Sequence, residues 1–222
     1  MQWRWTNLRD SHELYCAGHL IEAAVAHFEA TGKRTLLDVM CRYADCIDRS
    51  FGRGAQQQRG YPGHEEIELA LVKLHRATGE ARYLALARYF IDERGQQPHY
   101  FDGEARARGE DPAQFRFTNY EYNQSHLPVR QQTVVTGHAV RAMYLYSAMA
   151  DVANADGDAG LLPAQHCAPD GRCGWVLLLH GGTQPVGTPV CCQYGCGAGE
   201  WCDRAHCAAH AIPMGWVRGA NH

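Results

Sequence analysis

The sequence predicts an all-α fold built from helical hairpins. Up to about residue 158, apolar residues recur at intervals of three and four, the spacing of helices with one buried face. An Ala-Thr-Gly turn occurs twice, at Thr31–Gly32 and at Thr78–Gly79, 47 residues apart. Repeated hairpins of this length are typical of an α-solenoid or an (α/α) toroid. Residues 159–222 are rich in cysteine and glycine and do not continue the pattern, so we predict a helical domain over 1–158 and an irregular tail over 159–222.

The first hairpin is expected between Asp10 and Phe51. Asp10 and Glu13 have the spacing of a capping box, in which each side chain bonds a backbone N–H at the helix start. The helix that follows ends at Thr31–Gly32, because glycine accepts the left-handed conformation that closes a helix. Its expected buried positions are Leu14, Ala17, Leu20, Ile21, Ala24, Val25 and Phe28. A second helix carries apolar residues from Leu36 to Ile47 and ends before Phe51.

Three more helices follow. The pattern predicts one from Glu65 to Ala77 and a partner with apolar residues from Tyr83 to Ile91, which Gly95 stops. A fifth runs from about Thr133 to Ala153. Its expected buried stripe is Val135, Ala139, Ala142, Met143, Tyr146 and Met149.

Two connections are longer than packing requires. They are the glycine-rich segment Gly52–Gly63 and the segment Gln96–Pro128, which is rich in His, Tyr, Phe, Asn and Arg. Long polar and aromatic loops in a helical domain are usually functional. They suit sugars, whose apolar faces stack on rings while their hydroxyls need hydrogen-bonding partners.

Composition narrows the function classes. With 45% hydrophobic residues the chain can form a core, and a formal charge of −3 argues against general binding to nucleic acid or anionic membranes. No apolar run approaches the roughly 20 residues of a membrane helix, and the start shows no signal-peptide pattern. We therefore expect a soluble, cytoplasmic protein, with Cys16, Cys41 and Cys46 as reduced, buried or near-site thiols.

Three histidines stand at predicted helix starts: His12, His64 and His138. If successive hairpins line a ring, their helix starts converge on one cavity. Each histidine has a simpler interpretation as a surface or capping residue, and both interpretations remain open at this point. The sequence contains no phosphate-binding glycine loop, no HExxH and no CxxC motif.

Other polar residues are interpreted structurally. The acidic cluster Glu65–Glu68 is read as favourable charge at a helix N-terminus, without a catalytic role. Cys16 is assigned to the core and Arg141 to a structural pair, whereas Arg130 is left between substrate binding and ion pairing. We expect surface or packing roles for His19, His27 and His75.

Three segments carry a specific resemblance. Residues 5–20 read WTNLRDSHELYCAGHL, residues 60–71 read GYPGHEEIELAL, and residues 126–130 and 137–142 read HLPVR and GHAVRA. In order and spacing they resemble the signatures of glycoside hydrolase family 127, the β-L-arabinofuranosidase family. The resemblance covers residues 3–158.

The resemblance implies a fold and a chemistry. The family's catalytic domain is an (α/α)6 barrel, so the helical domain is expected to form part of one. His12, His64 and His138 match the family's sugar-contacting histidines, and the expected ligand is an L-arabinofuranoside or a related sugar. The family works by a retaining displacement, with a zinc-bound cysteine thiolate as nucleophile and a glutamate as acid/base. One glutamate and three cysteines hold its zinc.

The tail departs from that pattern. Gly181–Gly182 and Cys207–Ala209 resemble family segments, but the expected acid/base position falls at Pro189–Val190. The expected zinc-ligand glutamate falls at Ala205, and Cys191–Cys192 lies too early to match the family's nucleophilic pair. The tail is interpreted as a disrupted frame or gene fragment, as a divergent end, or as a small zinc or disulfide module.

These observations leave competing functions. The first is a truncated glycosidase that retains part of the sugar pocket, lacks the acid/base glutamate and cysteine nucleophile, and binds no zinc in a family-like site. The second is a non-catalytic helical-repeat module that binds a sugar or a protein. A zinc protein built on the tail is the third. An incomplete barrel also leaves an apolar face open, so we expect self-association through that face.

Overall fold

The computed structural model describes residues 3–114, 119–132 and 135–161. Over these residues it contains six α-helices, four short 3-10 turns and no strand, which confirms the all-α prediction. The helices are α1 (Glu13–Thr31), α2 (Thr35–Ser50), α3 (Ile67–Thr78), α4 (Ala81–Glu93), α5 (Tyr100–Ala107) and α6 (Ala139–Asp156). No helix of this described part is both long and apolar enough to cross a membrane.

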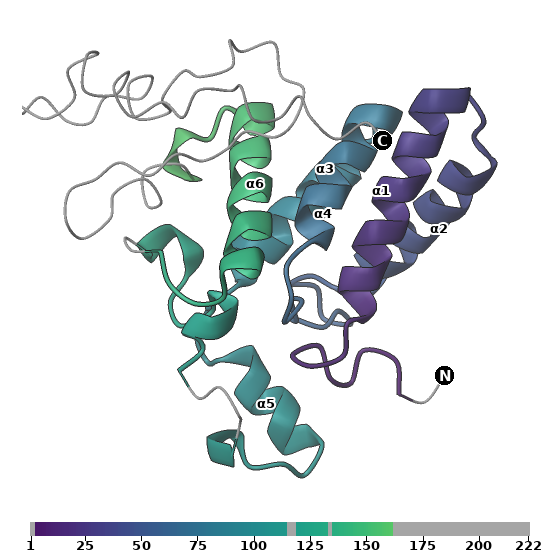
Figure 1. Ribbon diagram of the computed structural model, residues 1–222. Coiled ribbons are helices and arrows are strands. Elements are labelled where there is room, and N and C mark those ends of the chain that lie inside the picture. Colours follow the sequence, from purple (N-terminus) through teal and green to yellow (C-terminus); the bar gives the residue numbers. More distant parts are fainter. Residues whose placement is uncertain (1–2, 115–118, 133–134, 162–222) are drawn as a thin grey trace, which may run out of the picture.

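Helix α3 is the centre of the packing. It contacts α1, α4 and α6, while α2 packs on α1 and α5 stands apart with the segment that follows it (Figure 1). Every residue of α3 from Ile67 to Val72 is buried, as is Leu74. Because α3 is enclosed on several sides, the chain segment that leads into it is also enclosed. That segment carries His64.

The two predicted hairpin turns have the same hydrogen bonds. Gly32 and Gly79 close α1 and α3 with φ of 70° and 76°, in the left-handed region that glycine adopts readily. In each turn the threonine hydroxyl donates to the carbonyl four residues earlier and accepts the N–H two residues later. The structure thus shows that the repeated turns are equivalent.

The capping box predicted for α1 is wrong. His12 occupies the N-cap, and its side chain makes no capping hydrogen bond. Glu13 Oε2 instead accepts the backbone N–H of Trp5 at 2.9 Å, and Asp10 pairs with Arg9 at 2.6 Å. The segment before the helix folds back on it, so Glu13 bonds a residue outside the helix.

Three further boundaries differ from the predictions. Helix α3 begins at Ile67 rather than Glu65, and α5 lies inside the expected loop Gln96–Pro128. Helix α6 begins at Ala139 because Gly137 adopts φ of +79° against the carbonyl of Glu121. A Cβ at Gly137 would lie 1.8 Å from that carbonyl oxygen, so the chain turns there before the helix starts.

Several predicted core positions are exposed. They are Leu20 on α1, Leu36 and Val39 on α2, and Val135, Ala139 and Met143 at or near α6. The remaining predicted positions of α6, Ala142, Tyr146 and Met149, are buried. Periodicity identified five of the six described helices and missed α5, and it overestimated the width of the buried faces. The boundary at residue 158 stays a prediction, because residues 162–222 lie outside the described ranges.

Candidate functional site

The structure brings the three histidines together. The ring of His64 lies 5.7 Å from that of His12 and 6.5 Å from that of His138, measured between centroids. His12 is the N-cap of α1, His138 is the N-cap of α6, and His64 precedes α3. Helix starts that are far apart in the sequence therefore meet at one place, as expected for hairpins around a common cavity.

Two tyrosines complete this histidine cluster. Tyr15 lies one turn after His12 on α1, and its ring centroid is 4.4 Å from that of His64. Tyr144 on α6 lies 6.0 Å from His64 and 6.3 Å from Tyr15. Sequence reasoning missed both, although their helical offsets from His12 and His138 place them near the same helix ends. Together the rings offer apolar faces beside polar nitrogen atoms.

His64 has a defined hydrogen-bonding role. Its Nδ1 lies 2.9 Å from the backbone carbonyl oxygen of Glu65. A carbonyl only accepts hydrogen bonds, so Nδ1 carries the proton and Nε2 is left as an acceptor. Burial lowers the pKa of His64 to about 4, and Arg141 adds to the effect. His64 is therefore a neutral imidazole at physiological pH.

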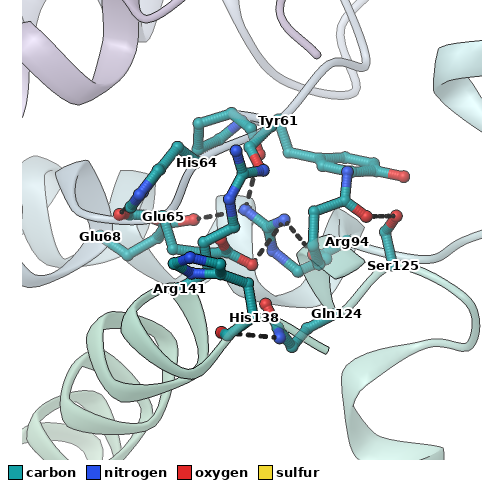
Figure 2. Close-up of polar contacts among 12 residues, drawn as sticks. Tyr61, His64, Glu65, Glu68, Arg94, Gln124, Ser125, His138 and Arg141 are labelled. Carbon is teal, nitrogen blue, oxygen red and sulfur yellow. Dashed lines mark hydrogen bonds and ion pairs between the residues drawn. The ribbon is translucent and has the colours of Figure 1, made fainter. Parts of the chain in front are cut away.

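A buried arginine contacts the segment that carries His64. Arg94, at the end of α4, is fully buried and pairs with Glu65 and Glu68, each at 3.0 Å (Figure 2). It donates to the carbonyl of Pro62 at 2.8 Å and to that of Asn123 at 2.9 Å. One guanidinium group thus holds the segment before α3 and the segment before α6 at the same time.

The acidic cluster is not solvated first-turn charge. Glu65, Glu66 and Glu68 are each 0% exposed. Burying carboxylates is costly unless they are paired or neutralised, so these residues form an internal network. Burial pushes the pKa of Glu65 upward, while the paired Arg94 guanidinium opposes this shift and favours the carboxylate, and burial raises the pKa of Glu66 to about 10. Sequence position at a helix start gave no sign of this burial.

The segment around Asn123 fixes His138. The backbone N–H of His138 donates to the carbonyl of Tyr122 at 3.1 Å. The side chain of Gln124 donates to the carbonyl of Thr136 at 2.8 Å (Figure 2 shows its contact with His138). The expected loop Gln96–Pro128 therefore contributes to the site by holding a neighbouring element.

The arginines of the predicted sites have structural partners. Arg141 donates to the carbonyl of Gly63 and lies over the ring of Tyr122, which agrees with its expected structural role. Arg130 pairs with Asp92 and Asp158, each at 2.8 Å, so its ion-pairing alternative is the one observed.

One minor expectation needs correction. Cys16 is exposed on α1 rather than part of the core, whereas Cys41 and Cys46 are partly buried. His19 packs against Tyr15 and Tyr144, in agreement with its expected surface or packing role, and its Nδ1 also lies 3.5 Å from the buried Glu66. Residues of α1 between His12 and Glu22 therefore make polar contacts that the spacing of its apolar residues did not predict.

The positions that correspond to the family's zinc–thiolate site fall outside the described residues. Cys16, Cys41 and Cys46 are free thiols, and within the described ranges no group of three or more potential metal ligands includes a cysteine. The predicted tail positions, Pro189–Val190, Cys191–Cys192 and Ala205, lie outside the described residues.

Over the described residues the fold is all-α, and its helix starts gather histidine and tyrosine rings into one cluster. The family model of the β-L-arabinofuranosidase GH127 catalytic domain matches residues 1–166. The chain therefore belongs to glycoside hydrolase family 127.

Individual relatives agree with the family model. A non-reducing end β-L-arabinofuranosidase of Bifidobacterium longum subsp. longum is 44% identical over 161 residues, which are 72% of this chain and 24% of that protein. The crystal structure of a family 127 β-L-arabinofuranosidase from Geobacillus stearothermophilus T6 matches with a TM-score of 0.71 and 60% identity, covering 73% of this chain and 26% of that one. A second family 127 β-arabinofuranosidase matches with a TM-score of 0.61 and 44% identity, over 72% and 23% of the two chains. This chain spans about a quarter of the length of these relatives.

Proposed function

We propose that this chain forms the sugar-recognition part of a β-L-arabinofuranosidase pocket. In this proposal its helices are part of an (α/α)6 barrel, and the ligand is a terminal β-L-arabinofuranoside or a related sugar. The observation that carries the proposal is the convergence of His12, His64 and His138 from three separate elements. The three residues match the family's sugar-contacting histidines.

The chemistry of the cluster suits a furanoside. The acceptor nitrogen Nε2 of His64 takes a hydrogen bond from a sugar hydroxyl, while a neutral His12 or His138 can donate to one hydroxyl and accept from another. The rings of Tyr15 and Tyr144 cover the apolar face of the sugar. These contacts orient the terminal residue and select its hydroxyl pattern.

We further propose that the chain binds this sugar without hydrolysing it. Within the described residues, Cys16, Cys41 and Cys46 are free thiols. The sequence comparison of the tail adds that the expected acid/base and zinc-ligand glutamates fall at Pro189–Val190 and Ala205. The same observations favour the second candidate, a non-catalytic sugar-binding module, over a complete enzyme.

Two measurements test the proposal. Saturation-transfer NMR with methyl β-L-arabinofuranoside is expected to show binding by the purified chain, with the signal lost in His64→Ala and retained in His27→Ala, an exposed histidine of α1. No sugar contact in the unmodified chain would contradict the binding proposal. Hydrolysis of an aryl β-L-arabinofuranoside that stops on adding a chelator would contradict the absence of catalytic machinery.

A further inference from the structure

We propose that His19, Glu22 and Glu66 bind a divalent cation between α1 and the start of α3. This site is separate from the histidine cluster and contains no cysteine, so it does not depend on the proposed sugar function. His19 and Glu22 lie about one turn apart on α1, and Glu66 is the N-cap of α3. The cation would join the two helices at the edge of the pocket.

The ligand atoms already have suitable separations. The Nδ1 atom of His19 is 3.5 Å from Glu66 Oε1 and 3.7 Å from Glu22 Oε2, and one ligand atom from each residue lies within 4.8 Å of the others. A cation bound tetrahedrally at about 2.0–2.2 Å keeps its ligands about 3.4 Å apart. Only small side-chain movements are needed to bring all three atoms to bonding distance.

The state of Glu66 gives a second, independent indication. Its side chain is 0% exposed, and within the described residues no N–H group donates to either of its oxygens, although its carboxyl lies close enough to that of Glu22 for the two to share a proton. The fold makes room for it, because a Cβ on Gly18 would lie 1.4 Å from Glu66 Oε2. A buried carboxylate beside another carboxylate requires a proton or a cation between them. Glu66 therefore faces Glu22 and His19 in a position where a cation can replace a shared proton.

Lys73 does not occupy the oxygen of Glu22 that would bind the cation. Its ammonium group contacts Glu22 Oε1, whereas the oxygen nearest His19 is Glu22 Oε2. The side chain of His19 is 41% exposed, so water can complete the coordination from that side. One imidazole and two carboxylates suit Mn²⁺, Fe²⁺ or Zn²⁺, and they lack the thiolates that select strongly for zinc.

The proposed cation would lie next to the histidine cluster. The ring of Tyr15 lies 4.4 Å from that of His19 and 4.4 Å from that of His64. Tyr144 likewise contacts both histidines, at 6.1 Å and 6.0 Å. A cation on His19 fixes one side of this group of edge-on and tilted rings, and the tyrosines transmit its position to His64.

Electron paramagnetic resonance with Mn²⁺ tests the proposal on the full chain. Mn²⁺ is preferred to Zn²⁺ as the probe because the tail contains seven cysteines, which would bind zinc. We expect one bound Mn²⁺ per chain and about tenfold or weaker affinity in His19→Gln and Glu66→Gln. His27→Gln, on the exposed face of the same helix, is the matched control and is expected to bind normally.

A spectroscopic readout makes the test independent of variant folding. Electron spin echo modulation of the unmodified Mn²⁺ complex detects a directly bound imidazole nitrogen, which this site requires. Failure of the unmodified chain to take up Mn²⁺ would show that Glu22 and Glu66 share a proton only, and would overturn the proposal. Uptake without nitrogen coupling, or uptake unchanged in helical His19→Gln and Glu66→Gln proteins, would also overturn it.

Discussion

Arg94 and Glu65 form a fully buried ion pair, with 3.0 Å between Nη1 and Oε1, directly below the loop that carries His64. The same guanidinium group reaches Glu68 and the carbonyls of Pro62 and Asn123. A residue that contacts neither histidine ring therefore connects the elements that present His64 and His138.

Replacing Arg94 with methionine is expected to destabilise the fold by about 3–5 kcal/mol, because it leaves buried carboxylates without their partner. Chemical denaturation followed by circular dichroism measures this loss. The matched control is Arg106→Met, since Arg106 is 66% exposed and pairs with Asp102 only at 3.8 Å. We expect that control to change the free energy of unfolding by less than about 1 kcal/mol. Equal effects in the two variants would contradict a central role for Arg94.

His64 is expected to remain neutral through the physiological range. Its pKa is about 4 in the folded chain, below the ordinary value of 6.5. The unfolded chain takes up a proton near pH 6.5 while the folded chain does not, so the stability contribution is present above pH 6.5 and is lost as the pH falls toward 4. NMR titration of the His64 ring is expected to show no protonation between pH 8 and pH 5. A midpoint near 6.5 for this ring would refute the buried, neutral assignment.

The sequence predicted five of the six described helices, all except α5, and the converging histidines, because helical spacing and glycine stops are local signals. It did not predict that Glu65, Glu66 and Glu68 are buried, since their partners Arg94 and Glu22 are distant in the sequence. The capping box failed for a related reason: Glu13 bonds Trp5 in a segment that folds back on α1. Local pattern thus located the site, whereas the charges that support it depend on tertiary contacts.

Gly18 tests how closely α1 and α3 approach. A Cβ there would lie 1.4 Å from Glu66 Oε2 and 2.9 Å from the Cα of Ile67. Gly18→Ala is therefore expected to cost about 1–3 kcal/mol of stability, although alanine favours helices, because the backbone of α3 must shift. Thermal denaturation compares it with Gly103→Ala on α5, where a Cβ meets nothing within 4 Å. That control is expected to stabilise by up to about 1 kcal/mol. Stabilisation by both substitutions would contradict the close approach.

The apolar side chains exposed on α6 make self-association testable. Val140 and Met143 lie three residues apart on one helix face and are 50% and 47% exposed. An open face of this kind favours contact between copies of the chain through apolar burial. Sedimentation velocity is expected to show a concentration-dependent oligomer, and the double change Val140→Lys with Met143→Lys should return the chain to a monomer.

The control for this surface is Val39→Lys, which alters an exposed valine on α2, on the other side of the helical array (Figure 1). We expect Val39→Lys to leave the oligomer intact, because α2 packs on α1 and lies at the opposite side of the helical array from α6 (Figure 1). If Val39→Lys dissolves the oligomer and the α6 double variant does not, the association surface lies on α2. A chain that sediments as a monomer at all concentrations would show that these apolar side chains are tolerated in water.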